Sequence, residues 1–215
     1  MRREQIGRED EMVSAEQVRV KFTKTGNLQF ISHLDLMRTV VRLMLRAEIP
    51  VAVTEGFNPH PKISFVLPLS VGTQSECEYL DFRITGDIGF SSIIGRMNAQ
   101  SVPGLTFLRA STPVHKCGEV GFAVYDIVSA EEYDAEALFS RPIVVTKHTK
   151  SGDKETDIRP QVRAWKKEGN TLTVTLAASG ADYLNPEYLV TAIGLVDYDI
   201  IRKKVLLADG ETEFE

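Results

Sequence analysis

The residues best suited to chemistry gather between positions 33 and 62. His33 and Asp35 fall in the first turn of an expected helix, where free backbone N–H groups and the helix dipole favour anions. Asn58, His60 and Lys62 alternate with two prolines, so an extended chain would point their side chains to one side. If the helix start and this loop meet, the group could bind an anion, or transfer protons through its two imidazoles.

Each of these residues also has a purely structural interpretation. Asp35 follows Ser32 by three residues, which resembles a capping box, and His33 fits an exposed first-turn residue. The proline-rich loop is also a rigid turn that needs no chemistry. Glu76 and Glu78 begin an expected strand and could bind a metal or act as an acid–base pair, yet surface glutamates are common. No His-x-x-x-His, Cys-x-x-Cys or P-loop occurs, so no metal or nucleotide motif is predicted.

Basic charge is concentrated in the same part of the chain. Residues 17–75 hold seven Lys or Arg against three Asp or Glu, although the whole chain has a formal net charge of −5. Arg38, Arg42 and Arg46 recur every four residues and form a basic stripe along the expected helix. This asymmetry marks a surface for an anionic partner. The acidic total argues against a dedicated, high-affinity nucleic-acid binder.

Hydrophobic periodicity predicts the elements that position these residues. Strands and helices follow the order β-α-β-β-α-β, first up to residue 113 and then in a varied form that includes a helix over 131–139. The basic helix begins at Ser32, and its core face is expected to hold Leu34, Met37, Val41, Met44 and Leu45. We therefore expect an α+β protein of two tandem ferredoxin-like (split βαβ) halves with antiparallel sheets. The expected division is a charged N-terminal extension (1–16), a first ferredoxin-like domain (17–113), a linker (114–121), a second ferredoxin-like domain (122–209) and an acidic tail (210–215).

Composition favours a reducing compartment. Cys77 and Cys117 are too few for a disulfide framework or an iron–sulfur cluster. Residues 1–16 are too charged for a signal peptide, and no apolar run is long enough to cross a membrane. We therefore expect a cytoplasmic protein that binds no membrane and carries neither a metal nor a cofactor of its own.

Several runs resemble one known family. The longest are 21–28 (KFTKTGNL), 32–38 (SHLDLMR) and 56–65 (GFNPHPKISF), and weaker ones are 68–72 (PLSVG), 78–81 (EYLD) and 157–160 (DIRP). Over about residues 17–207 the chain resembles the radical-SAM-linked family of unknown function, whose members are fused or adjacent to B12-binding radical-SAM proteins. The extension over 1–16 departs from the family's short start. The resemblance implies a radical-SAM partner carrying a 4Fe-4S cluster, S-adenosylmethionine and B12, since this chain has no Cys-x-x-x-Cys-x-x-Cys.

Three functions from different classes follow. The first is a binding module that recruits an RNA or a nucleotide to the radical-SAM partner. Its candidate ligand-binding residues are His33, Asp35, Arg38, Arg42, Asn58, His60, Lys62 and Glu78. The second is a structural subunit of the complex, with the polar cluster dispersed and a large apolar patch exposed. The third is a metal-independent RNA-processing or phosphoryl-transfer enzyme with His33 and His60 as general acid and base. Whether the chain has any activity of its own is left open.

Overall fold

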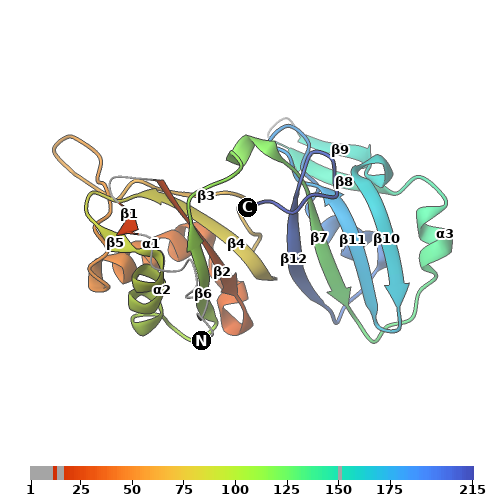
Figure 1. Ribbon diagram of the computed structural model, residues 1–215. Coiled ribbons are helices and arrows are strands. Elements are labelled where there is room, and N and C mark those ends of the chain that lie inside the picture. Colours follow the sequence, from red (N-terminus) through yellow and green to blue (C-terminus); the bar gives the residue numbers. More distant parts are fainter. Residues whose placement is uncertain (1–11, 14–16, 150–151) are drawn as a thin grey trace, which may run out of the picture. The chain divides into compact units, whose positions relative to one another are not determined.

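The computed structural model describes residues 12–13, 17–149 and 152–215 (Figure 1). Most of the expected N-terminal extension lies outside the described residues. The chain divides into two compact units: the first comprises residues 1–71 and 77–114, and the second comprises 72–76 and 115–215. The described part holds four α-helices and strands that pair mostly antiparallel, which confirms the α+β class.

The first unit follows the expected order of elements. Its strands β2, β3, β4 and β6 form a sheet in the order β3-β4-β2-β6, and two short strands, β1 and β5, pair separately. Strand β4 begins in residues of the second unit and continues into the first. The elements are β1 (Met12–Val13), β2 (Gln17–Lys24), a 3-10 turn (Gly26–Phe30), α1 (His33–Arg46), β3 (Ile63–Phe65), β4 (Thr73–Arg83), β5 (Ile88–Gly89), α2 (Phe90–Ala99) and β6 (Leu105–Ser111).

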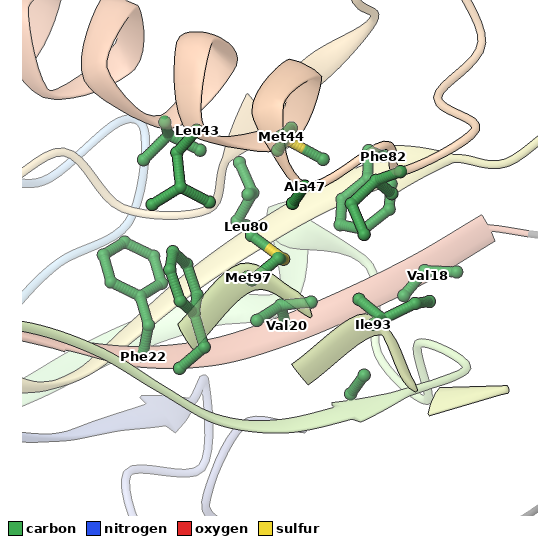
Figure 2. Close-up of a cluster of buried hydrophobic side chains, with 14 of the residues drawn as sticks. Val18, Val20, Phe22, Leu43, Met44, Ala47, Leu80, Phe82, Ile93 and Met97 are labelled. Carbon is green, nitrogen blue, oxygen red and sulfur yellow. The ribbon is translucent and has the colours of Figure 1, made fainter. Parts of the chain in front are cut away.

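The core of the first unit lies between its helices and one face of this sheet. Figure 2 shows Leu43 of α1 and Met97 of α2 facing Val20, Phe22 and further side chains of β2 and β4. Strand β2 alternates apolar with polar residues over its first six positions, so every second side chain enters this core. Burying such residues stabilises the unit by roughly 1.5–3 kcal/mol each.

The buried face of α1 differs from the predicted one. Leu36, Val40 and Leu43 are buried, as is Met44, whereas Leu34 and Leu45 are 55% and 63% exposed. The helix has apolar residues on most of its circumference, and packing against the sheet selects the face that carries 36, 40, 43 and 44. The predicted start is confirmed, because the Ser32 hydroxyl accepts a hydrogen bond from the amide of Asp35.

The second unit is built around a sheet with the order β10-β11-β7-β12. The other edge of β12 pairs in parallel with residues 73–75 at the start of β4, and β8 and β9 form a separate hairpin. The elements are a 3-10 turn (Cys117–Glu119), β7 (Val120–Val128), α3 (Ala135–Phe139), β8 (Val144–Thr149), β9 (Gly152–Asp157), a 3-10 turn (Arg159–Gln161), β10 (Val162–Glu168), β11 (Thr171–Ala177), α4 (Glu187–Ile193) and β12 (Asp199–Leu207).

Two parts of the second unit depart from the sequence predictions. The helix expected over 131–139 covers only its last five residues, because the Glu131 carboxylate instead accepts the amides of Val196 and Asp197. The six C-terminal residues, expected to be an acidic tail, include Phe214, which is fully buried and whose amide donates to the Val205 carbonyl. Phe214 is therefore part of the packed unit.

The turn before β6 depends on a glycine. Gly104 has φ +87°, and a Cβ there would overlap the Thr25 carbonyl oxygen, while the Thr25 amide donates to the Gly104 carbonyl at 2.8 Å. We expect Gly104→Ala to lower the free energy of unfolding by about 1–3 kcal/mol. The matched control is Gly95→Ala in α2, where a Cβ meets nothing within 4 Å. It should instead raise stability by up to about 1 kcal/mol. Urea unfolding distinguishes the two, and equal stabilities would contradict this account of the turn.

Candidate functional site

The first unit contains a cavity of about 760 Å³. That volume falls within the range of small-molecule sites in proteins. The cavity, called the pocket below, is lined by α1, by the hairpin-like segment 52–62, by β3 and by the end of β4, with Gln17 at the start of β2. Its apolar walls come from Met37, Val41, Pro61, Ile63 and Phe82.

Helix α1 contributes two guanidinium groups to the pocket. Arg38 and Arg42 lie one turn apart, each directly after a pocket-lining apolar residue, so one helix face supplies both a wall and two charges. Arg46, the third member of the predicted stripe, does not line the pocket, and its guanidinium donates to the Gln100 carbonyl. The stripe is therefore divided between a pocket and a packing contact.

The 52–62 segment positions Lys62 and Arg83 next to one another. The Ala52 amide donates to the Arg83 carbonyl at 2.7 Å, and the Lys62 amide donates to the Ala52 carbonyl at 2.9 Å. Val53 and Pro61 form a bridge beyond this point. The backbone of Ala52 is thus hydrogen-bonded to both Lys62 and Arg83, and both of these residues line the pocket.

His60 is fixed by contacts within the same segment. Its amide donates to the Thr54 hydroxyl at 3.1 Å, and its Nδ1 lies 3.1 Å from that hydroxyl and 3.3 Å from the Asn58 carbonyl oxygen. A carbonyl only accepts, so the contact to Asn58 is a hydrogen bond when Nδ1 carries the proton. In the neutral ring Nε2 is then an acceptor, and the residue lines the pocket.

The charge of the pocket is strongly positive. Within the described residues, the side chains of Arg42, Lys62 and Arg83 make no hydrogen bond or ion pair. The acidic residue of the wall, Asp81, is buried and receives two hydrogen bonds of 2.7 Å from the Arg19 guanidinium. Among the described residues these three cations therefore have no ion-pair partner, and such a cluster of positive charge favours the binding of an anion.

Four of the predicted site residues lie elsewhere. The His33 ring packs edge-on against Phe65, with centroids 5.2 Å apart, and lies outside the pocket lining. The Asn58 side chain does not line the pocket either. Glu78 is buried, whereas Glu76 is partly exposed and pairs with Lys203 at 2.5 Å. The interpretation of Glu76 and Glu78 as two exposed strand residues is thus wrong for Glu78.

Asp35, the fourth, acts as part of the helix start. The Ser32 hydroxyl donates to the Asp35 carboxylate at 2.7 Å, and the Arg38 guanidinium donates to it at 3.2 Å. The bond from Ser32, more than the one from Arg38, lowers the pKa of this carboxyl below its usual value, against an opposing effect of desolvation. The carboxylate therefore holds Arg38 at the edge of the pocket and stays ionised at neutral pH.

The structure adds pocket residues that the sequence interpretation missed, above all Arg83. The sequence signal for Arg83 is the alternation of apolar residues at 80, 82 and 84, which places Arg83 on the opposite face of a strand. Arg83 reaches the pocket only because the segment before the proline-rich loop pairs with this strand, as Val51 does with Ile84. In the described part of the chain, no three His, Cys, Asp or Glu side chains are arranged to hold a metal ion. Among the same residues, no helix is long and apolar enough to cross a membrane.

Comparison with known proteins gives a family without an assigned activity. Residues 17–186 match the model of the family described as "Uncharacterized protein conserved in bacteria (DUF2344)". The match covers all pocket-lining residues and both units in large part. No curated protein matches the chain. The chain therefore belongs to this family of uncharacterized proteins conserved in bacteria.

Proposed function

We propose that the chain is an accessory module that binds a nucleotide, free or at the end of an RNA, and presents it to a radical-SAM partner. The proposal of a nucleotide ligand rests on one observation: Arg42, Lys62 and Arg83 surround one pocket and form no ion pair with any described residue. The partner rests on the resemblance of runs 32–38 and 56–65 to the radical-SAM-linked family. The partner would carry the cluster, S-adenosylmethionine and B12.

Electrostatics favours a phosphate group in this pocket. Clustered cations repel one another, and an anion that binds among them relieves the repulsion while gaining charge-assisted hydrogen bonds. Two guanidinium groups match the geometry of phosphate oxygens, and an ammonium adds a point charge. Arg38 joins this group while remaining tied to Asp35.

The size and walls of the pocket favour a ligand larger than a phosphate. A cavity of 760 Å³ with apolar side chains from α1, β3 and β4 has room for a base and a sugar as well as the anion. A folded RNA is too large to enter, so an RNA would insert a terminal or splayed nucleotide.

The two other functions have weaker support. The structural-subunit hypothesis expects the polar cluster to be dispersed, yet Arg38, Arg42, His60 and Lys62 share one pocket. The acid–base hypothesis expects His33 beside His60, and His33 packs on Phe65 instead. The second candidate function is therefore an enzyme in which a single imidazole, that of His60, transfers the proton through Nε2.

The strand orders support a finer description of the fold, in which both units are variants of the split βαβ plan. If the four sheet strands of the first unit are numbered 1 to 4 along the chain, their order across the sheet is 4-1-3-2, which is β6-β2-β4-β3. The second unit has the same arrangement as β12-β7-β11-β10, with the β8–β9 hairpin inserted after a short helix. We therefore propose two tandem ferredoxin-like units.

Titration calorimetry with adenosine 5′-monophosphate tests the proposed ligand. The test variant is Arg42→Gln/Lys62→Gln, and the matched control is Arg46→Gln/Arg96→Gln, which removes two charges from the same unit outside the pocket. We expect the test variant to lose affinity by at least about 10-fold, because two charge-assisted hydrogen bonds are removed. Equal affinities in the two variants would reject the pocket as the site.

A single-stranded oligoribonucleotide separates RNA from free nucleotide. If the pocket holds an RNA end, the wild type binds the oligonucleotide. The slope of log affinity against log salt then becomes shallower by roughly 0.7 for each phosphate that the test variant no longer neutralises. If the pocket holds only free nucleotides, adenosine 5′-monophosphate binds and the oligonucleotide does not. A pull-down of the tagged wild type from cell extract checks the partner, which should be a radical-SAM protein that the test variant also retains.

A further inference from the structure

The segment that lines one side of the pocket ends in a tip with an unusual aromatic residue. The segment is closed at its base by the Thr54 amide, which donates to the His60 carbonyl at 2.9 Å, and it appears as the projecting orange loop of Figure 1. Between these two residues, Glu55, Gly56 and Phe57 make no hydrogen bond with any described residue. Among the described residues, the hydrogen bonds of the tip are therefore confined to its two ends.

Phe57 at this tip is completely exposed to solvent. A phenylalanine side chain gains roughly 1.5–3 kcal/mol when it is removed from water, so a fully exposed one leaves a large gain unrealised. Gly56 precedes it with φ +119°, a backbone conformation that side chains rarely adopt. The tip therefore combines a free aromatic ring with an adjacent residue of unusual conformational range.

The tip is close enough to the pocket to cover it. Thr54 and His60 line the pocket, and Phe57 is three residues from each, which is at most about 10 Å of extended chain. A spherical cavity of 760 Å³ is about 11 Å across. The Phe57 ring is therefore within chain reach of a ligand whose phosphate lies among Arg42, Lys62 and Arg83.

We propose that Phe57 is a specificity-determining residue that stacks on the planar base of the nucleotide held in the pocket, an inference that rests on the proposed function. The cations bind the phosphate of any such ligand. Phe57 adds affinity only for ligands that carry a flat ring, because stacking on an aromatic side chain needs a π-face. The tip therefore selects nucleotides over sugar phosphates and inorganic phosphate.

The test compares adenosine 5′-monophosphate with ribose 5-phosphate on Phe57→Ala, Phe57→Tyr and wild type. Phe57→Ala should lower the affinity for adenosine 5′-monophosphate by about 5- to 100-fold and change the affinity for ribose 5-phosphate by less than about two-fold. Phe57→Tyr should keep the affinity of the wild type, since its ring also stacks. Phe30→Ala is the control, because Phe30 is an exposed phenylalanine of the same unit outside the pocket lining, and it should change neither ligand.

The outcomes separate this inference from the proposed function. If Arg42→Gln/Lys62→Gln loses the nucleotide but Phe57→Ala binds both probes as the wild type does, the anion site stands and the stacking role is rejected. Equal weakening of both probes by Phe57→Ala also rejects it. If Phe57→Ala releases the radical-SAM partner in a pull-down and keeps its nucleotide affinity, the tip is a docking residue and the stacking role is again rejected. If the wild type binds neither probe, both proposals fail.

Discussion

Replacing Asp81 with asparagine is expected to lower the free energy of unfolding of the first unit by about 3–5 kcal/mol. The Arg19 Nε and Nη2 atoms each donate to one carboxylate oxygen of Asp81 at 2.7 Å, and the two side chains are only 2% and 5% exposed. Removing the carboxylate charge takes the negative charge of Asp81 away from a buried guanidinium. The penalty is the part of that cation's desolvation that the Asp81 charge offsets in the wild type.

Hydrogen exchange of the amides in β2 and α1 measures this effect within the first unit. The double variant Arg19→Met/Asp81→Leu should recover much of the stability, because it removes both charges together. Arg38→Gln is the control within the same unit, since the Arg38–Asp35 pair is exposed and an exposed ion pair contributes little to stability. A double variant less stable than Asp81→Asn, or a decrease below about 1 kcal/mol in Asp81→Asn, would contradict this role of the pair.

Local signals were sufficient for the elements with clear periodicity. The alternating residues 171–177 form strand β11, and α1 begins at the predicted Ser32 cap, because alternation and capping are encoded within a few residues. Strand β10 was not predicted, since its sequence carries an arginine, two lysines and a glutamate. It is an edge strand of the second sheet, with one neighbour, and exposed charges are tolerated there.

The candidate site was predicted in part for a similar reason. Arg38 and Arg42 follow from helical spacing, and His60 and Lys62 follow from alternation in an extended loop, so these four residues reach one pocket. Arg83 is brought there by the bond between its carbonyl and the Ala52 amide, a pairing of residues 31 positions apart that no local pattern encodes. The prediction for Glu78 is wrong for the same physical reason. Its sequence neighbours are typical of an exposed strand residue, but residues distant in the sequence bury it.

Phe214→Ala is expected to lower the free energy of unfolding of the second unit by about 3–5 kcal/mol. Phe214 is fully buried, its ring lies 6.0 Å from the His115 ring, and its amide donates to the Val205 carbonyl at 2.9 Å. The turn before it is fixed by Asp209, whose carboxylate accepts the amides of Glu211 and Thr212. A cavity at this position cannot be filled by the chain end alone, since the backbone on both sides is already bonded.

Fluorescence of Trp165 during urea unfolding measures the change, because the chain has one tryptophan and it stacks on Phe139 within the second unit. Phe214→Leu should be more stable than Phe214→Ala, since it leaves a smaller cavity. Glu211→Ala, an exposed change in the same turn, should stay within about 0.5 kcal/mol of the wild type. If Phe214→Ala and Glu211→Ala have the same free energy of unfolding, burial of the Phe214 ring contributes nothing to stability and this prediction is wrong. If only the Phe214 variants lose free energy of unfolding, the packing of this ring stabilises the second unit. Removing residues 214 and 215 should then lower the urea concentration at which this unit unfolds.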